Sequence, residues 1–266
     1  MISALNIAAT GMSVAVDEIN TVANNLSNLQ TTSFKSMMVV SSDLKYNTRA
    51  PSGLIRADGG EGAPTGVQFG SGTKTAATFR IIKQGDIKST GDPLHLAISG
   101  SGYFKVRVGD KDCYTRAGSF RRNAQTGLLV TSEGYVVGDG IEIPEKYAKA
   151  KLFNITSKGE LQYTDDEQQN PETFAQLELF TFPNESALDA IGDNLFLPSE
   201  GGSGFAIPGI PGENGVGTLE WHSLEQSTVD AVEELTHAIA AQRAYELMSK
   251  MIKISDEMMS SANQVK

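Results

Sequence analysis

The feature that most constrains this chain is a repeat in its first thirty residues. Apolar or small side chains recur there every seven residues, in two rows offset by three positions. The rows consist of Leu5, Met12, Ile19 and Leu26, and of Ala8, Ala15, Val22 and Leu29. Two such rows are the a and d positions of a helix that winds against a partner helix. The pattern therefore predicts one helix over residues 2–29.

The end of the chain has a similar character. Ser227 and Asp230 resemble a capping box, so a second helix is expected to begin near Ser227. A looser apolar stripe follows at spacings of three and four, and Arg243 interrupts it. Its members are Val232, Leu235, Ile239, Leu247, Met251, Ile254 and Met258. Since both terminal helices need an apolar partner, we expect them to pair with each other as a coiled coil.

The N-terminal helix is short of charge. Asp17 and Glu18 are its only charged residues. A helix that packs on one side normally carries charged residues on its outer face. We therefore expect this helix to have neighbours on several sides. A buried helix in a globular core is the alternative interpretation.

Between the two helices the chain is first irregular and then β-rich. Residues 31–72 are expected to be an extended linker or loop region, because glycines and prolines gather between residues 46 and 66. Short strands separated by turns follow, and no helices alternate with them, which favours a mainly antiparallel β domain. The predicted fold class is α+β, with paired terminal helices around this domain. The predicted divisions are 1–30, 31–72, 73–222 and 223–266.

Three strand patterns inside the β-rich region are specific enough to be checked. Phe104, Val106 and Val108 alternate with charged residues, which predicts a half-buried strand. Residues 157–159 (SKG) lie between two short segments, 155–156 (IT) and 160–163 (ELQY), which predicts a hairpin. Residues 174–182 predict one further strand that ends at Pro183.

Composition excludes several classes of protein. The net charge is −10 and the estimated pI is 4.8, which disfavours nucleic acid as a ligand. Cys113 is the only cysteine, so no internal disulfide is possible. No apolar run approaches the roughly 18 residues of a membrane span. The first basic residue is Lys35, so we expect no cleavable secretion signal at the N-terminus.

The sequence predicts no catalytic, cofactor or metal site. The histidines are not spaced as ligands on one element; they are His95, His222 and His237. Ser101 lies between two glycines but lacks the Gly-x-Ser-x-Gly spacing of a nucleophile turn. The acidic cluster at residues 165–167 does not match a calcium loop. Cys113 is expected to be a half-buried, inert thiol.

Several motifs are spread over nearly the whole chain. Those near the ends are ATGM at 9–12, ANNLSN at 23–28, TTSFK at 31–35 and QRAYE at 242–246. Those between them are GVQFG at 66–70, QGD at 84–86, LAISGSGYF at 96–104, YTRAGSF at 114–120 and LEQSTV at 224–229. With these motifs the chain resembles the bacterial flagellar rod and hook proteins, and among them the distal-rod group. Ser33 stands where that family usually has glycine, Asn6 replaces an aromatic residue, and residues 46–66 match in position but hardly in sequence.

The resemblance implies a structural subunit and not an enzyme. Such a subunit polymerises into a rigid helical tube that crosses the periplasm and transmits torque, with the terminal helices inside and the β domain outside. It is exported through the flagellar type III apparatus without signal cleavage. Its implied partners are further copies of itself, the proximal rod and hook subunits, and the surrounding ring proteins. We assign contacts between subunits to Asn24, Asn25, Phe34, Gln242, Arg243 and Tyr245.

Three other functions stay open at this point. A proximal rod or hook subunit of the same family would differ mainly in the stiffness of the polymer. A β-rich glycan-binding module would have to use Trp221, the one tryptophan, for sugar stacking. A hydrolase would have to use Ser101 as its nucleophile.

Overall fold

The computed structural model describes residues 2–50, 66–143, 153–163, 172–199 and 201–264. The chain divides into two compact units. The first, here called the helical unit, comprises Met1–Ser27, Met37–Phe79 and Asp230–Lys266. The second, here called the β unit, comprises Asn28–Ser36 and Arg80–Val229. The division predicted from the sequence, at 1–30, 31–72, 73–222 and 223–266, stays a prediction.

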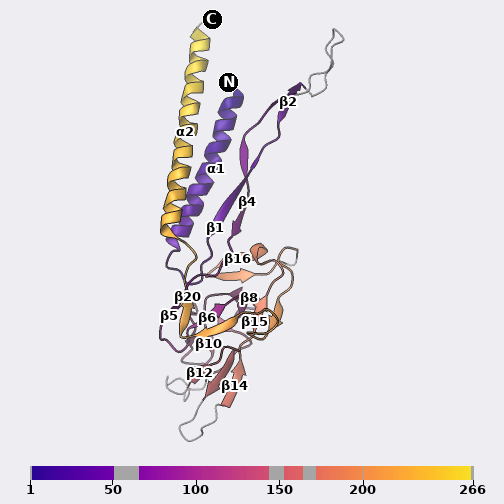
Figure 1. Ribbon diagram of the computed structural model, residues 1–266, viewed down its shortest axis with the longest axis vertical. Helices are drawn as coiled ribbons and strands as arrows, with labels where there is room; N and C mark the ends of the chain where they lie inside the picture. Colours follow the sequence, from indigo (N-terminus) through magenta and orange to yellow (C-terminus); the bar gives the residue numbers. More distant parts are fainter. Residues whose placement is uncertain (1, 51–65, 144–152, 164–171, 200, 265–266) are drawn as a thin grey trace. The chain divides into compact units, whose positions relative to one another are not determined.

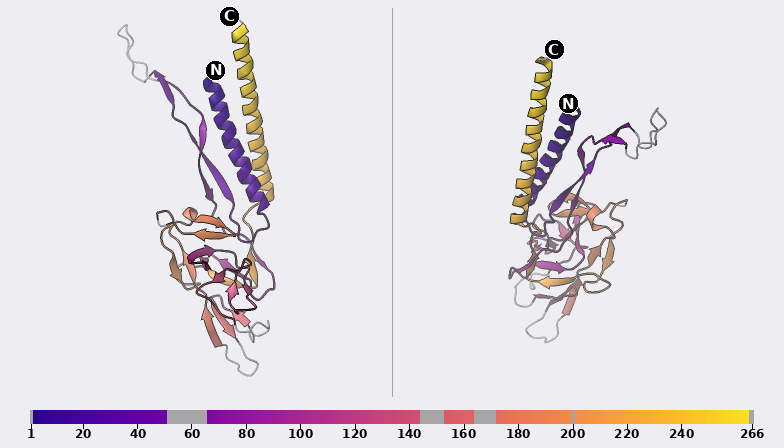
Figure 2. Two further views of the ribbon diagram at one scale, coloured as in Figure 1. Left: turned by 180° about the vertical axis from the view of Figure 1, so that it is seen from behind. Right: turned by 45° about the horizontal axis from the view of Figure 1, so that its top comes forward.

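Two antiparallel helices lie side by side in the helical unit (Figures 1 and 2). They are α1 (Ile2–Ser27) and α2 (Ala231–Gln264). The N-terminal helix therefore exists as predicted but ends at Ser27, so Leu29 lies in the following turn. Asp230 caps α2, because its Oδ1 accepts hydrogen bonds from the N–H groups of Val232 and Glu233 at 2.8 and 3.3 Å. The predicted start near Ser227 was a few residues too early.

A long hairpin covers a second side of α1. Strands β1 (Met37–Asp43) and β4 (Thr73–Arg80) form a two-stranded sheet, and β2 (Asn47–Ala50) pairs with β3 (Val67–Phe69). The hydroxyl of Thr75 donates to Asp17 Oδ2 at 2.6 Å, which ties β4 to α1. α1 thus has neighbours on two sides, as its lack of charge predicted. The expected linker contains paired strands, while residues 51–65 of the predicted loop lie outside the described residues.

The β unit is built from antiparallel pairs. Its main sheet has the order β16–β17–β8–β7–β11–β10–β9, and β15 joins it by pairing with β7 and β18. These strands are β7 (Tyr103–Val108), β8 (Lys111–Thr115), β9 (Arg121–Arg122), β10 (Leu129–Val130), β11 (Val136–Val137), β15 (Leu179–Thr181), β16 (Asp189–Gly192), β17 (Leu195–Leu197) and β18 (Ile207–Gly209). A short 3-10 helix, η2 (Glu185–Ala187), precedes β16. The α+β class with antiparallel sheets is therefore confirmed.

Smaller sheets complete this unit. β12 (Phe153–Ile155), β13 (Glu160–Tyr163) and β14 (Glu172–Gln176) form a three-stranded sheet. Two further pairs join early strands to late ones. They are β5 (Ile87–Ser89) with β20 (Ser223–Glu225), and β6 (Leu96–Ser99) with β19 (Thr218–Trp221). Strands from both ends of its sequence thus close the β unit.

The strand predictions were correct in two cases and wrong in one. The alternation around Phe104 is confirmed by β7, and the hairpin around residues 157–159 is confirmed by β12 and β13. The single strand over residues 174–182 is wrong, because β14 and β15 belong to different sheets. β14 pairs with β13 as far as Gln176. The chain then changes partner, and Leu179 in β15 pairs with Phe104 in β7. The change of partner interrupts the strand without interrupting the apolar pattern.

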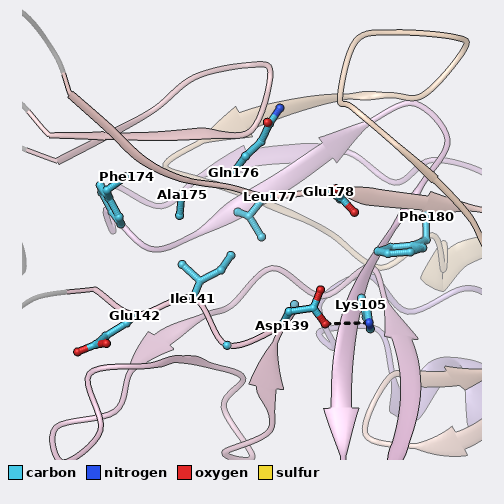
Figure 3. A pocket seen from close by; sticks show the side chains of 12 residues that line it. Lys105, Asp139, Ile141, Glu142, Phe174, Ala175, Gln176, Leu177, Glu178 and Phe180 are labelled. Carbon is cyan, nitrogen blue, oxygen red and sulfur yellow. Dashed lines mark hydrogen bonds and ion pairs between the residues drawn. The ribbon is translucent and has the colours of Figure 1, made fainter.

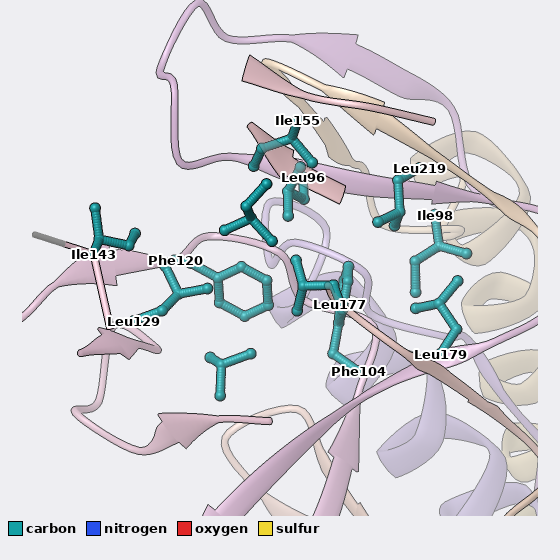
Figure 4. Close-up of a cluster of buried hydrophobic side chains, with 12 residues drawn as sticks. Leu96, Ile98, Phe104, Phe120, Leu129, Ile143, Ile155, Leu177, Leu179 and Leu219 are labelled. Carbon is teal, nitrogen blue, oxygen red and sulfur yellow. The ribbon is translucent and has the colours of Figure 1, made fainter. Parts of the chain in front are cut away.

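One apolar cluster forms the centre of the β unit (Figure 4). It draws on the main sheet, on the pair β6 with β19 and on the three-stranded sheet. The ring centroids of its aromatic members Phe104 and Phe120 lie 4.9 Å apart, edge to face. Its other members are Leu96, Ile98, Leu129, Val137, Ile143, Ile155, Leu161, Leu177, Leu179 and Leu219. Burial of these side chains stabilises the unit as a whole, because they come from strands throughout its sequence.

Gly118 offers a test of this packing. A Cβ atom at this position would collide with the backbone carbonyl oxygen of Leu96, whose N–H donates to the Gly118 carbonyl at 3.0 Å. We expect Gly118→Ala to lower the free energy of unfolding by about 1–3 kcal/mol, because the two main chains must separate. Gly201→Ala is the control, since nothing lies within 4 Å of its Cβ position. Equal thermal stability of the two variants would contradict the argument.

Candidate assembly surface

The predicted rows of α1 face inward to different degrees. Ala8 and Ala15 are buried, and four larger members are half-buried: Leu5, Met12, Ile19 and Val22. Leu26 is 36% exposed, and Leu29 lies beyond the end of the helix. Val14 is also buried, although it belongs to neither row. The small residues therefore pack most closely, and the larger ones lie at the margin of the contact.

The predicted stripe of α2 is exposed in the single chain. Its seven members are 48–74% exposed: Val232, Leu235, Ile239, Leu247, Met251, Ile254 and Met258. The expectation that this stripe faces α1 is therefore corrected. Spacings of four outnumber spacings of three along it, so it winds away from a seven-residue seam. Its role in assembly stays a prediction.

A different row of α2 lies against α1. Glu234, Ala241 and Ser255 are buried, at separations of seven and fourteen residues. Met248 continues this row, and its Cε lies 3.3 Å from the Cβ position of Gly11. The row is mostly small or polar, so a search for apolar side chains passes over it. The seven-residue spacing from Glu234 through Ala241 and Met248 to Ser255 was the signal that could have identified it.

The exposed face of α2 is a candidate for contact with other molecules. Monomeric proteins rarely expose large apolar side chains along one continuous element, and such surfaces mark interaction sites. α1 adds Ile7, Val16 and Leu26 at 36–40% exposure. The hairpin of the helical unit adds further exposed apolar residues: Met38, Val40, Tyr46, Val67 and Phe69. The helical unit thus presents apolar side chains from all three of its components.

The residues predicted to contact other subunits lie in different environments. Asn25 is 1% exposed, and its side chain bonds to Met37 and Glu234, so it lies away from the surface of this chain and its assignment to a subunit contact stays a prediction. Asn24 is exposed and lies 3.7 Å from Met37 Sδ. Phe34 is half-buried in the β unit. The other three are exposed on α2 and stay candidates for contact: Gln242, Arg243 and Tyr245.

A buried ionic cluster lies in the β unit, and sequence reasoning missed it. Glu225 Oε1 lies 2.6 Å from Lys35 Nζ, and Glu225 Oε2 lies 3.0 Å from Arg116 Nε. All three side chains are at most 4% exposed. Arg116 also donates to the carbonyls of Gly100 and Gly102, and the Gly85 N–H donates to Glu225. Since the members are far apart in sequence, no local pattern announces the cluster.

Burial and the neighbouring charges act in opposite directions on the pKa values of this cluster. Burial alone would raise the pKa of Glu225, but the charges of Arg116 and Lys35 and their hydrogen bonds hold it below its ordinary value. Burial lowers the pKa of Lys35, against the raising effect of Glu225. Glu225 is thus the hydrogen-bonded counter-charge that these two buried cations share. Its removal would take that counter-charge from both.

Ser33 has a backbone conformation that glycine adopts more readily than serine. Its φ is +57°, in the left-handed region that favours glycine. Its N–H donates to the carbonyl of Glu225, and its hydroxyl donates to the carbonyl of Arg116, both at 2.9 Å. The chain thus forms a left-handed turn here with serine in place of glycine. The hydroxyl bond offsets part of the cost of the left-handed backbone.

Reactive groups do not converge in the described part of the chain. In a surface pocket of the β unit, Lys105 pairs with Asp139 at 2.9 Å beside the ring of Phe180 (Figure 3). The hydrogen bond to Asp139 raises the pKa of Lys105, so the pair remains ionic. Among the described residues no group of three His, Cys, Asp or Glu side chains could hold a metal ion. Ser101 lies in an exposed turn between strands.

The comparisons with known proteins decide the family. The models described as "Flagellar hook protein FlgE/F/G D1 domain" and "Flagellar basal body rod FlgEFG protein C-terminal" match residues 97–163 and 222–265. The flagellar basal-body rod protein FlgG of Caulobacter vibrioides is 42% identical over 264 residues, covering 99% of both chains. The chain belongs to the FlgG family. FlgG of Borreliella burgdorferi is 42% identical over 100% of this chain and 99% of its own. FlgG of Agrobacterium fabrum is 38% identical over 97% of each.

Membership in the FlgG family makes this chain a structural protein of the flagellar basal-body rod, and not an enzyme. No helix in the described ranges is both long and apolar enough to cross a membrane. The ionic cluster takes on meaning in this context. Lys35, Gly85, Arg116 and Glu225 come from four of the motifs on which the family resemblance rested, so those motifs meet in one buried network.

Glu225→Gln tests this network. Because Lys35 and Arg116 would lose their counter-charge while still buried, we expect a loss of about 3–5 kcal/mol in the free energy of unfolding at neutral pH. Chemical denaturation followed by Trp221 fluorescence measures it. Glu220→Gln, on the exposed side of β19, is the matched control and should change little.

The difference in stability between the unsubstituted chain and Glu225→Gln should depend on pH. The folded pKa of Glu225 is depressed, so its stabilisation is present above the unfolded value of about 4.3 and is lost as pH falls through the folded value. The gap in stability between the unsubstituted chain and Glu225→Gln should therefore narrow in acid. A gap that widens in acid would contradict the assignment.

Proposed function

We propose that this chain is a subunit of the flagellar distal rod that polymerises into a rigid helical tube and transmits torque. The observation that carries the proposal is the exposed apolar face of α2 in a chain that aligns over its full length with basal-body rod proteins. A chain with an apolar face and no partner for it within its own fold gains free energy by association.

The chemistry of this face favours a polymer. Full burial of one Leu, Ile or Met side chain stabilises an interface by about 1.5–3 kcal/mol, so seven half-exposed side chains can offset the entropy of association. The face lies on one helix, while other exposed apolar residues lie on α1 and the hairpin. Contact between unlike surfaces generates an open helical assembly when the rotation does not close.

The arrangement of the tube forms part of the proposal. Residues 1–30 and 223–266 would form its inner layer, with α1 and α2 paired as a coiled coil, and residues 73–222 would form its outer layer. Many packed interfaces, and no single site, would make such a tube stiff. The two-sided packing of α1 in the single chain is the start of this pattern.

Partners and route of delivery follow from the family. We place the subunit in the rod that spans the periplasm, between proximal rod and hook subunits and inside the ring proteins. It would reach that place through the flagellar type III export apparatus, without signal cleavage. The support for this route is the alignment of the whole chain with basal-body rod proteins.

The alternatives are less well supported. A proximal rod or hook subunit of the same family is the first alternative, but the relatives named above are all basal-body rod proteins called FlgG. A glycan-binding module would need an exposed tryptophan. Trp221 is instead half-buried against the core, and its Nε1 donates to the Pro93 carbonyl at 2.7 Å.

A substitution on α2 tests assembly. Ile239 is 51% exposed, so Ile239→Asp should leave the monomer folded but place a charge in the proposed interface. We expect it to abolish the straight hollow tubes that electron microscopy should show for the unsubstituted protein. His237→Asp places the same side chain at an exposed position two residues away, which does not share a face with Ile239, and should still assemble. Tubes of normal length from Ile239→Asp would refute the assigned surface.

A further inference from the structure

One polar pair lies inside the contact between α1 and α2. Asn25 is 1% exposed and Glu234 is 9% exposed. Asn25 Nδ2 donates to Glu234 Oε1 and to the Met37 carbonyl, both at 2.8 Å, and its Oδ1 accepts from the Met37 N–H at 2.9 Å. The amide thus uses three hydrogen bonds to join both helices to the first residue of β1.

The rest of the contact discriminates poorly between registers. In α1 the most buried apolar residues before Asn25 include Ala8 and Ala15, seven positions apart. In α2 the corresponding row contains Ala241, Met248 and Ser255, again at seven-residue intervals. A slide of one helix by seven residues would replace Met248 by Ala241 or Ser255 opposite Gly11, and both of these side chains are small enough to fit there. Packing alone therefore gives the alternative registers similar energies.

The polar pair distinguishes them. Asn25 lies opposite Glu234 and Gly11 opposite Met248, which defines the native register. A seven-residue slide in one direction would place Glu234 opposite Glu18, and two carboxylates would then face each other. A slide in the other direction would place Asn25 opposite Ala241, and Glu234 would lie beyond Ser27, where α1 ends. In both cases the buried amide and carboxylate lose each other as partners.

We propose that Asn25 and Glu234 are positioning residues that set the register of α1 against α2. A buried polar group without a partner costs far more than a mismatch between small apolar side chains, so the pair selects one register. Because Asn25 also holds Met37, the same register fixes where the hairpin leaves the helices. The inference rests on the proposed function in one respect: the register determines how the exposed faces of α1, α2 and the hairpin combine into one surface for a neighbouring subunit.

Cysteine cross-linking in the full-length chain measures the register. In a Cys113→Ala background, Gly11→Cys with Met248→Cys reports the native register. Gly11→Cys with Ala241→Cys, and Gly11→Cys with Ser255→Cys, report the two shifted registers. We expect the native pair to cross-link at least about tenfold more than either shifted pair. Asn25→Leu with Glu234→Leu should reduce this ratio of native to shifted cross-linking about fivefold or more.

The chain supplies a matched control one position away on each helix. Asn24→Leu with Glu233→Leu makes the same two changes at exposed positions and should keep the native ratio. Glu234→Gln retains an acceptor for Asn25 and should also keep it. Asn25→Ala is the second variant if the double leucine change reduces helix content by circular dichroism, and it should lower the ratio too.

The outcomes separate the inference from the proposed function. An unchanged ratio in both Asn25→Leu with Glu234→Leu and Asn25→Ala would overturn the role in register. A reduced ratio with normal tubes would retain that role and refute its link to assembly. If the unsubstituted chain forms no tubes at all, the proposed function fails, while the cross-linking ratios still decide the register.

Discussion

The carboxylate of Glu225 is the interaction on which the β unit depends most. It accepts hydrogen bonds from Lys35, Arg116 and the Gly85 backbone, which come from widely separated parts of the sequence. Since a buried charge is tolerated only when it is paired and hydrogen-bonded, these segments must all be in place together. Further hydrogen bonds join residues 33–36 to residues 225–228. The Ser33 N–H donates to the Glu225 carbonyl, and the Thr228 N–H donates to the Phe34 carbonyl. The strands that lead into this network, β5 with β20 and β6 with β19, close the unit around its apolar core.

The helical unit uses a different principle. The most buried side chains of its helix contact include several alanines and polar groups, while seven larger apolar side chains of α2 are exposed. Small residues allow the helices to approach closely, and the large ones are left for other molecules. A subunit that works only in a polymer has reason to divide its side chains in this way, because its strongest apolar surface is most useful between copies.

The sequence predicted both helices and the antiparallel β unit, because each depends on a local period. It predicted the wrong face of α2 for the contact with α1. The prediction looked for large apolar side chains, whereas the buried residues Ala241 and Ser255 have small ones. It also failed to separate β14 from β15, since an apolar pattern does not record a change of partner strand. Lys35, Arg116 and Glu225 could not be associated, because no pattern in one sequence joins residues so far apart. The family motifs contained all three, and only the fold shows that they meet.

The ionic contact between Lys35 and Glu225 spans 190 residues of chain. Loop-closure entropy grows with such a span, and folds dominated by distant contacts form slowly compared with helical pairs. The β unit thus cannot complete its core from any short stretch of nascent chain. Its closure waits for β19 and β20, which are the last strands made. Topology alone therefore leaves an interval in which most of the chain has been synthesised but the β unit has not yet folded. During that interval the chain could still pass through a narrow channel.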